Sequence, residues 1–531
     1  MDTTQPPTPP PARAGRREWV GLAVLMLPVL LIAMSVTVMN FAVPHLGADL
    51  RPSSTELLWI MDVYTFLLAG LLLTMGALGD RIGRRRLLLL GAAAFGIASV
   101  ASAFATTPGM LIAARAVLGV AGATLMPATL ALIRTLFTDP GQRKLAIGLW
   151  TGGFIGGTAI GPLAGGVLLE FFWWGSVFLV NVPVMVLLLV VGPFLLPEAR
   201  DEHAGGLDWL SALLSLASVL PIVYGIKQFS ENGPTWTAAA SVAVGLAVGT
   251  WLVLRQLRLT DPVIDVRLFR DPAFSVALLT VLLGVFSLVG FMFFVSQYLQ
   301  LVLGLRPITA GLWMLPMVVM SATGAVLSVA LSTRVHPGHV VGSALVLGTC
   351  GMLTLTQVTP ETGIALLLCG MGMVGAGMGA IASVCTDLVV ASAPPRRAGA
   401  AASLSEAAGE LGGALGIAVL GSIGMAVYRG GVSAEAPDDA PPEVAEAVQE
   451  TLPGAVAVSE QLPPDAGDQV REVAFRAFTE GMQSSALSSA LVLAVAAVLV
   501  FATLRRIPAQ DLGREHEDPP GPAEGRRPGE D

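Results

Sequence analysis

Fourteen stretches of about 20 mainly apolar residues follow one another along the chain, and this pattern limits its fold more than any other feature. A helix of about 20 residues is long enough to cross the hydrocarbon core of a bilayer. Apolar residues make up 54% of the 531 residues and charged residues only 13%, so a water-soluble domain could not bury them all. We therefore predict an all-α polytopic membrane protein with fourteen spans: 20–42, 57–78, 87–106, 109–134, 145–169, 176–196, 208–227, 235–256, 273–298, 308–331, 338–358, 362–390, 399–428 and 483–504.

The Lys and Arg residues divide unequally between the connections, and this predicts the orientation. If the N-terminus is cytoplasmic, 23 of the 30 lie in the two tails and the even-numbered loops. Six, among them Lys227, lie in the odd-numbered outer loops, and Arg115 lies within a span. Because cytoplasmic loops are enriched in Lys and Arg, both termini are predicted to be cytoplasmic. An odd number of spans would mix the two sets, so fourteen spans are favoured over thirteen.

An internal repeat divides the predicted spans into two halves. Residues 118–150 and 373–404 each contain a Gly-rich span, a turn with Pro, a basic pair and another span rich in small residues. These segments match spans 4–5 with spans 12–13. We therefore expect an N-terminal six-helix half at 20–200, two inserted helices with a linker at 201–272, and a C-terminal six-helix half at 273–504. Repeated halves around a central site are common in secondary transporters.

Three polar segments lie outside the predicted spans. The tails, 1–19 and 505–531, are predicted to be disordered and cytoplasmic because of their composition. The outer loop 429–482 contains eleven acids and three arginines. Apolar spacing in 440–452 and 468–482 predicts that this loop is partly helical. We expect a solvated acidic cap, with attraction of cations as the weaker alternative.

The loop between spans 2 and 3 carries a dense motif, GALGDRIGRRR (76–86). Gly76 allows close helix approach, Gly83 permits a tight turn, and Asp80 can pair with Arg84 or with a neighbouring helix end. A basic run alone only anchors a loop in the cytoplasm. The full pattern G-x-L-x-D-R-x-G-R-R, which includes Arg81, resembles the signature of the major facilitator superfamily at this loop. The resemblance implies a cytoplasmic gating loop.

Arg115 lies inside span 4, in LIAARAVLGVAGA (111–123). It is about six residues, or roughly 9 Å, from the start of the span, so it needs a cavity or a partner. The segment resembles the superfamily's R-x-x-x-G-x-x-G-A motif, which is associated with proton coupling.

Span 5 contains GTAIGPLAGGVLL (157–169), in which small residues recur at helical spacing. Such glycines indicate close helix packing, and a proline removes one backbone hydrogen bond. The pattern G-x-x-x-G-P-x-x-G-G resembles the antiporter motif of drug exporters. Both interpretations are compatible, because a smooth, kinked helix can serve as a pivot between rocking halves. The motif residues are Gly157, Gly161, Pro162, Gly165 and Gly166.

Asp62 is a carboxylate inside span 2, near its outer end, within ELLWIMDVYTF (56–66). A charge at the centre of a membrane helix costs on the order of 3 kcal/mol on insertion scales, so acids within spans are functional by default. Trp59 and Tyr64 are close in sequence, and an acid with aromatic neighbours suits a lipophilic cation. We predict that Asp62 handles protons or substrate cations, with both aromatics as substrate contacts. The plainer alternative is that Asp62 only pairs with Arg115.

Three further acids in the second half are candidates for the same chemistry. Glu406 and Glu410 are four residues apart in span 13, so they lie on one helix face. They could divide proton and substrate handling between them, or, for Glu406 above all, form a wet stripe facing the cytoplasm. Asp387, near the inner end of span 12, could instead cap a helix end or meet Arg396 and Arg397.

Several segments together resemble the fourteen-span drug:proton antiporter family, of the QacA and SmvA type. They include FLVNVPV (178–184) and GGLDWLSALL (205–214), besides the motifs in spans 2, 5 and 13. The resemblance implies the major facilitator fold, a monomer in the bacterial cell membrane, and export of lipophilic, cationic antiseptics and dyes in exchange for protons by alternating access. One departure concerns span 1, SVTVMNFAVP (35–44), where Ser35 takes the place of the family's usual acid. This change favours a monocationic or neutral substrate, or coupling through Asp62 and span 13.

Two other functions stay open at this point. One is a dedicated proton-driven exporter of one metabolite or self-made antibiotic, and the other is a membrane sensor or scaffold that does not transport. An enzyme is not expected, because the sequence contains no H-E-x-x-H motif, no nucleotide-binding P-loop and no cluster of metal ligands. We likewise expect no cofactor, no metal, no nucleotide and no nucleic-acid partner.

Overall fold

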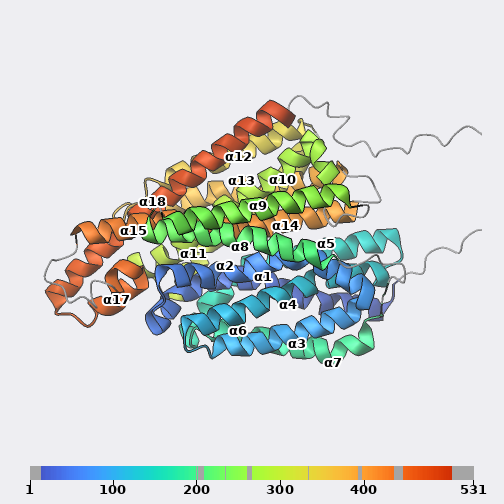
Figure 1. Cartoon of the computed structure of the whole chain (residues 1–531), viewed down its shortest axis with the longest axis horizontal. Coiled ribbons are helices and arrows are strands. Elements are labelled where there is room, and N and C mark those ends of the chain that lie inside the picture. Colours follow the sequence, from blue (N-terminus) through green and yellow to red (C-terminus); the bar gives the residue numbers. More distant parts are fainter. Residues whose placement is uncertain are drawn as a thin grey trace, which may run out of the picture.

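A computed structural model describes residues 14–198, 200, 208–233, 235–259, 266–332, 334–392, 398–435 and 447–504, and regular structure in this part of the chain is entirely helical (Figure 1). The first half contains α1 (Arg16–Leu50), α2 (Ser54–Ile82), α3 (Arg84–Ala103), α4 (Pro108–Leu136), α5 (Pro140–Phe171), α6 (Ser176–Leu179) and α7 (Asn181–Leu195). The inserted helices are α8 (Trp209–Asn232) and α9 (Trp236–Arg258). The second half contains η1 (Val266–Arg270), α10 (Pro272–Gln297), η2 (Tyr298–Val302), α11 (Pro307–Ser332), α12 (Pro337–Leu355), α13 (Ile364–Ala391), α14 (Ala398–Gly416), η4 (Ile417–Gly421), α15 (Ser422–Glu435), α17 (Leu452–Ser459) and α18 (Pro464–Thr503).

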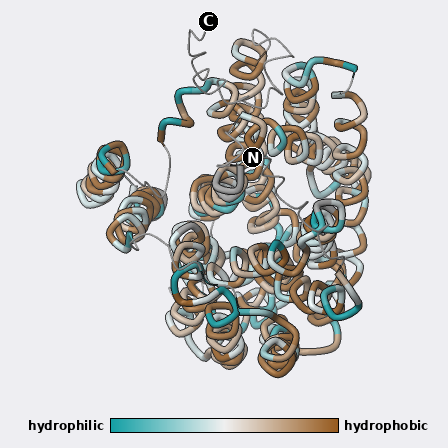
Figure 2. Tube along the Cα trace, turned by 90° about the vertical axis from the view of Figure 1, so that its right-hand side faces the viewer, coloured by the Kyte–Doolittle hydropathy of each residue, from teal (hydrophilic) through white to brown (hydrophobic). Residues whose placement is uncertain are grey.

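A helix covers each of the fourteen predicted spans. Among the described residues, thirteen helices are long and apolar enough to cross a membrane. The remaining predicted span corresponds to α5, a helix of 32 residues whose qualifying apolar segment is Ile160–Phe171. Hydrophobic residues run along the helices, while hydrophilic ones gather at turns (Figure 2).

Local sequence explains where several helices begin and end. Ser53 caps α2 by accepting a hydrogen bond from the backbone N–H of Glu56, whose carboxylate reciprocally accepts from the Ser53 N–H. Asp139 caps α5 by accepting a hydrogen bond from the backbone N–H of Gln142, and proline follows it at the first helical position. Gly83 separates α2 from α3 with a φ of 108°, a conformation that favours glycine. These signals set the register with which the apolar helices pack.

Two ends of the helical bundle can be distinguished in Figure 1. We call the end that carries α17 and the start of α18 the cap end. We call the opposite end, where α1 begins and α18 ends, the tail end. The sequence predicts that the cap end is the outer one. The N-terminal half is joined through pairs such as α1–α5 and α2–α4, and the C-terminal half through α11–α13 and α10–α14.

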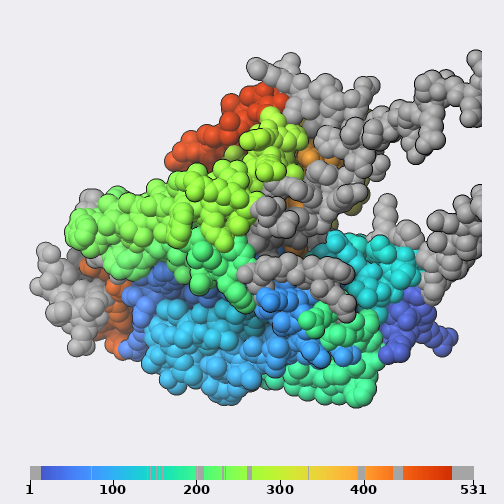
Figure 3. Space-filling view, turned by 45° about the vertical axis from the view of Figure 1, so that its right-hand side comes forward, coloured from blue at the N-terminus to red at the C-terminus, as the bar shows by residue number. Residues whose placement is uncertain are grey.

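The inserted helices form a hairpin on the side of the bundle. Helices α8 and α9 pack on each other, and α8 also contacts α2, η4 and α15. They lie in front of the other helices in Figure 1 and form a green ridge beside the blue N-terminal half in Figure 3. The hairpin therefore touches elements of both halves.

The halves meet in a series of polar contacts toward the cap end. The Ser296 hydroxyl donates to the Asn40 carbonyl at 2.7 Å, joining α10 to α1. The Ser54 backbone N–H donates to the Glu450 carboxylate at 2.8 Å. Glu170, near the end of α5, forms an ion pair with Arg306, just before α11. These contacts hold the cap end of the bundle together.

Two sequence-based boundaries differ from the structure. Helix α1 begins at Arg16, inside the segment predicted to be a disordered tail, and residues 1–13 of that tail lie outside the described residues. The last span was predicted to start at 483, but α18 begins at Pro464, because no proline separates its charged first turns from its apolar part and the single Gly481 there does not interrupt the helix. The outer loop is therefore partly helical, as predicted, although 436–446 lie outside the description. The C-terminal tail, 505–531, also lies outside it.

Candidate functional site

Asp62 forms a buried ion pair with Lys227 of the inserted helix α8. The Lys227 Nζ lies 2.9 Å from Oδ2 and 3.1 Å from Oδ1 of Asp62, and it donates a hydrogen bond to Oδ1. Both side chains have an exposed fraction of 0%. Removing one partner of such a pair leaves a buried charge without compensation, which typically costs 3–5 kcal/mol. The structure thus pairs the acid of the N-terminal half with a cation from outside that half.

Trp59 completes the surroundings of the ammonium group. The Lys227 Nζ lies 3.9 Å from the centroid of the Trp59 ring, which is cation–π geometry. Trp59 lies three residues before Asp62 on α2, so the two side chains share a helix face. Together the carboxylate and the indole form a subsite for an ammonium group, which we call the Asp62–Trp59 subsite.

The alternative in which Asp62 pairs with Arg115 is wrong. Arg115 is buried in α4, and its Nη2 donates to the carbonyl of Met61 at 3.1 Å, next to Asp62 in sequence. Its guanidinium carbon lies 5.4 Å from the centroid of the Tyr64 ring. Lys227 on α8 reaches the carboxylate itself, so Arg115 supports the α2 backbone and Tyr64 instead.

Tyr64 does not share the surroundings of Asp62. Residues two apart on a helix point about 200° from each other. Tyr64 accordingly packs on α4, where a Cβ added at Gly122 would lie 3.4 Å from the Tyr64 hydroxyl oxygen. Of the two predicted aromatic contacts, only Trp59 therefore lies at the ion pair.

Lys227 is a residue that the sequence interpretation placed wrongly, in an outer loop. Helix α8 continues to Asn232, so Lys227 lies in its last turns and is 1% exposed. The charge count treated every cation near the end of a span as part of a loop. A signal was present nevertheless: the chain contains only two lysines, Lys144 and Lys227, beside 28 arginines.

A cavity of about 480 Å³ lies between the inserted hairpin and both halves. Its lining comes from α2, α8, α9, η1, α10 and α14 and is mostly apolar, with Thr74, Ser211 and Gln256 among its polar members. Phe66, one turn after Asp62, belongs to this lining and also to a small buried cluster with Val223, Ala414 and Ala418. Since Val223 is one turn before Lys227, this cluster lies between the cavity and the ion pair.

The acids of the second half have different surroundings. Glu406 and Glu410 of α14 are partly buried, and among the described residues neither has a hydrogen bond or an ion pair. Glu410 interacts electrostatically with both Glu406 and Tyr64. Asp387, near the tail end of α13, is exposed, and its proposed partners Arg396 and Arg397 lie outside the described residues. The two glutamates are thus ionisable groups between the halves that have no fixed counter-charge in the part of the chain that the structure describes.

The predicted antiporter motif packs α5 against one helix of each half. A Cβ added at Gly157 would overlap the Leu30 carbonyl of α1, and one at Gly161 would overlap the Thr37 side chain. Gly165 also faces α1, at 3.3 Å from the Phe41 Cβ. At the cap end, a Cβ on Gly166 would lie 2.7 Å from the Pro307 carbonyl.

Pro162 of the same motif approaches α11 through its backbone. A Cβ added at Gly311 would lie 2.6 Å from the Pro162 carbonyl. The motif therefore permits close backbone contact of α5 with both α1 and α11, as its small residues predict.

The predicted gating loop is held by an acid that follows α7, Glu198. Asp80 pairs with Arg84 at 2.7 Å, one of its two expected partners, and Arg84 also donates to the Ala131 carbonyl of α4. Arg85 donates from its backbone N–H to the Glu198 carboxylate at 3.2 Å, and a Cβ on Gly83 would lie 2.5 Å from that carboxylate. Sequence reasoning did not include Glu198.

Two further residues of the loop motif contribute less. Gly76 faces α4, with its Cβ position 3.5 Å from Pro127, and Arg81 is exposed. The loop thus ties the tail ends of α2, α3, α4 and α7 together.

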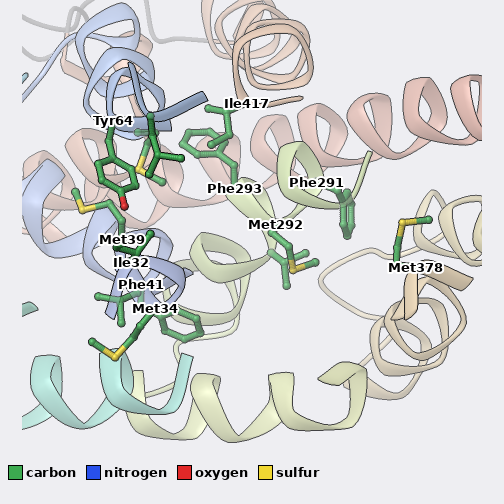
Figure 4. Close-up of a cluster of buried hydrophobic side chains, with 14 of the residues drawn as sticks. Ile32, Met34, Met39, Phe41, Tyr64, Phe291, Met292, Phe293, Met378 and Ile417 are labelled. Atoms are coloured by element: carbon green, nitrogen blue, oxygen red, sulfur yellow. The ribbon is translucent and has the colours of Figure 1, made fainter. Parts of the chain in front are cut away.

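Methionine and aromatic side chains fill the region between the halves. Figure 4 shows this cluster, with residues from α1, α2, α10, α13 and η4. Ser35, at the position of the missing acid in α1, donates its hydroxyl to the Leu31 carbonyl at 2.8 Å, so it acts within its own helix. Methionine adapts to ligands of varied shape. The labelled members are Ile32, Met34, Met39, Phe41, Tyr64, Phe291, Met292, Phe293, Met378 and Ile417.

Comparison with known proteins agrees with this architecture. The chain is 44% identical over 506 residues to the multidrug efflux pump LfrA of Mycolicibacterium smegmatis, covering 95% of this chain and 100% of that protein. It is 34% identical over 477 residues to the methyl viologen resistance protein SmvA of Salmonella typhimurium, covering 89% and 95%. It is 31% identical over 498 residues to the tetracenomycin C resistance and export protein of Streptomyces glaucescens, covering 91% of each chain.

A solved structure has a similar fold. The inward-facing, unoccupied structure of a bacterial homologue of the human lysosomal transporter Spinster superposes with a TM-score of 0.61 at 20% identity, covering 93% of this chain and 98% of that one. Residues 25–417 match the Major Facilitator Superfamily. The chain is therefore a multi-span membrane protein that belongs to the major facilitator superfamily.

Proposed function

We propose that this protein exports lipophilic monocations from the cell in exchange for protons, as a member of the fourteen-span drug:proton antiporters. The multidrug efflux pump at 44% identity over 95% of the chain supports export of drugs. The proposal also includes an N-terminal half at 20–200 and a C-terminal half at 273–504 that move as units, a monomeric state and cytoplasmic termini.

The observation that carries the proposal is the Asp62–Trp59 subsite. It holds an ammonium group, that of Lys227, between a carboxylate and an indole face in a fully buried position. Compact lipophilic cations require the same two features, an anion for the charge and an aromatic surface for the hydrocarbon. A site that already stabilises one organic cation is suited to exchange it for another.

The arrangement of the halves supports alternating access. The polar contacts toward the cap end, such as Ser296 with Asn40 and Glu170 with Arg306, keep that end together, while the cavity lies further toward the tail end. With the predicted orientation, the molecule described here receives substrate from the cytoplasmic side. The close α5–α11 contact at the antiporter motif would separate when the cap end opens.

We assign the carboxylates distinct roles in this cycle. Asp62 binds the cation, and Arg115 fixes the α2 backbone next to it. Glu406 and Glu410, which have no fixed counter-charge among the described residues, exchange protons from the second half. The gating loop, which includes Asp80 and Arg84, controls the tail end. Asp387, because it is exposed, serves at most as an acid on the way from the cytoplasm.

Everted membrane vesicles with an acidified lumen provide the test. We expect ethidium or tetraphenylphosphonium to release luminal protons from vesicles that contain the protein, and Asp62→Asn to abolish this release. The matched control is Glu361→Gln, which removes an exposed acid in the loop between α12 and α13 and should leave the exchange intact. An unchanged luminal pH on addition of either cation would contradict the proposal.

A dedicated exporter is the second candidate, and one comparison favours it. The relative from Streptomyces glaucescens is named for resistance to a single antibiotic and its export. The susceptibility of cells with and without this protein to a panel of chemically unrelated cations separates the two. Protection against several classes supports the multidrug function, and protection against one class supports the dedicated one.

A further inference from the structure

The ion pair with Asp62 does not by itself explain why residue 227 is a lysine and not an arginine. It is one of two lysines in the chain, whereas 28 other cations are arginines. It is the lysine of a buried ion pair, with a side chain that is 0% exposed. Arginine is the usual choice for a permanent buried pair, because it stays charged and binds a carboxylate through two parallel hydrogen bonds.

Lysine differs from arginine in one property that matters here. A lysine ammonium can release its proton and stay in an apolar site as a neutral amine, whereas an arginine guanidinium does not deprotonate in proteins. A buried ammonium without a counter-charge is strongly unfavourable. Lys227 is therefore charged while it holds Asp62, and the loss of that carboxylate to another cation drives it to the neutral form.

From these observations, and resting on the function proposed above, we infer that Lys227 is a tethered competitor of the cationic substrate and carries a transported proton. In the resting protein its ammonium occupies the Asp62–Trp59 subsite. A cationic substrate binds there by displacing it, and the displaced lysine releases one proton. The inserted hairpin thereby takes part in the exchange as well as in packing.

The charges balance in this step. Before it, the Asp62 carboxylate and the Lys227 ammonium sum to zero. One N–H bond of Lys227 breaks, the nitrogen keeps the electron pair, and the proton passes to water on the side from which the substrate came. Afterwards the Asp62 carboxylate and the substrate cation sum to zero, beside a neutral amine. On the other side of the membrane a proton rebinds Lys227, whose ammonium then displaces the substrate.

Among the described residues around Lys227, Asp62 is the one acid that forms an ion pair with its ammonium. Helix α2 contributes Asp62, with which Lys227 forms its ion pair, and Trp59, whose ring faces the ammonium. Helix α9 has no charged residue before Arg255, at its far end, and η4 has none. From α15, Tyr428 donates its hydroxyl to the Val448 carbonyl, and the charged residues of this helix are Arg429 and its last residue, Glu435. Arg115 of α4 also interacts electrostatically with Asp62, while its Nη2 donates to the Met61 carbonyl.

A route for the substrate is present next to the subsite. The 480 Å³ cavity includes Phe66 and Leu220 in its lining, about one and two helical turns from Asp62 and Lys227 respectively. The small cluster with Phe66 and Val223 lies between the cavity and the ion pair. A lipophilic cation in this cavity therefore needs one side-chain layer to open before it meets the ammonium of Lys227.

Replacement of each lysine by arginine tests the inference on the full chain in lipid nanodiscs. Binding of tetraphenylphosphonium is measured by calorimetry at pH 7 in two buffers of different ionisation enthalpy, which gives both the affinity and the number of protons released. For the wild type we expect about one proton per bound cation. For Lys227→Arg we expect the affinity to fall by ~100-fold or more, with no proton released, because a second cation stays beside the substrate. Lys144→Arg is the matched control and should behave as the wild type.

The outcomes separate this inference from the proposed function. If the wild type neither binds tetraphenylphosphonium nor releases a proton, the proposed function fails. If the wild type binds and releases a proton and Lys227→Arg does the same, the proton comes from another group and the inference alone is overturned.

A measurement on the wild type covers the case in which Lys227→Arg does not fold. Phenyl isothiocyanate is a lipophilic reagent that modifies only neutral amines, and mass spectrometry can quantify its attachment to each of the two lysines. We expect saturation with tetraphenylphosphonium to raise the modification of Lys227 relative to Lys144 by ~10-fold or more. An unchanged ratio between the two lysines would overturn the inference.

Discussion

The acid of the first half and the acids of the second half differ in how their negative charge is compensated. Asp62 is completely buried and has its own cation, Lys227, at 2.9 Å. Glu406 and Glu410 are partly buried and, among the described residues, have no hydrogen bond or ion pair. The fold thus neutralises one carboxylate with a side chain and leaves the other two to protons or ligands. Compensation by a tethered cation stabilises the empty state, whereas an uncompensated acid responds directly to its surroundings.

The largest expected effect comes from breaking the ion pair. Asp62→Asn leaves the Lys227 ammonium buried without a counter-charge, so we expect the free energy of unfolding to fall by about 3–5 kcal/mol at neutral pH. The double variant Asp62→Asn/Lys227→Met removes both charges and should recover most of this loss without recovering export. Unfolding of the purified variants in detergent measures both values. Equal stability of the single and double variants would contradict the compensation.

The stability of Asp62→Asn is expected to increase with pH. In Asp62→Asn the folded protein favours the neutral amine of Lys227, while the unfolded chain keeps the ammonium, so the unfolded state binds more protons. Its stability therefore rises with pH relative to the wild type. A deficit that is constant between pH 6 and 9 would mean that Lys227 stays charged in the folded variant.

Helix packing next to the acids is expected to be equally sensitive in both halves. A Cβ added at Gly119 of α4 would lie 2.5 Å from the Tyr64 carbonyl of α2, and one at Gly412 of α14 would overlap the Leu282 carbonyl of α10. Gly119→Ala and Gly412→Ala should each cost about 1–3 kcal/mol of unfolding free energy. Similar losses of stability in the two variants would mean that the halves differ in how they compensate their acids and not in how tightly their helices pack. Gly109→Ala, which meets nothing within 4 Å, is the control.

The aromatic wall of the subsite contributes less than the ion pair. Trp59→Leu removes the ring that lies 3.9 Å from the Lys227 ammonium but keeps an apolar side chain. We expect a loss of about 1–2 kcal/mol, since cation–π contacts gain strength when they are desolvated. Trp59→Phe should retain most of the stability. If Leu and Phe are equivalent at this position, the indole acts only by packing.

Sequence reasoning identified the fold and half of the ion pair. Asp62 could be found because a carboxylate in an apolar helix is costly and therefore conspicuous. Lys227 was missed because it lies near the end of α8, where a charge count assigns cations to loops, and because its partner comes from a helix that is distant in sequence. Tyr64 was misplaced for a simpler reason: residues two apart in sequence point to nearly opposite sides of a helix. The positions of the spans follow from local composition. The partners of a side chain depend on how its helix is rotated about its own axis and on tertiary packing.

The variant with the smallest expected change in stability, Glu410→Gln, distinguishes the acids of the two halves most clearly. Glu410→Gln removes a carboxylate that has no hydrogen bond or ion pair among the described residues, so we expect its unfolding free energy to stay within about 0.5 kcal/mol of the wild type. Export should nevertheless stop if this acid exchanges protons, because a glutamine cannot bind one and release it. Parallel measurements of ethidium efflux and unfolding would therefore separate the two halves: at Asp62 function and stability fall together, and at Glu410 function alone is lost. A Glu410→Gln protein that is as destabilised as Asp62→Asn would instead mean that α14 hides a fixed counter-charge, and the two halves would then handle their acids alike.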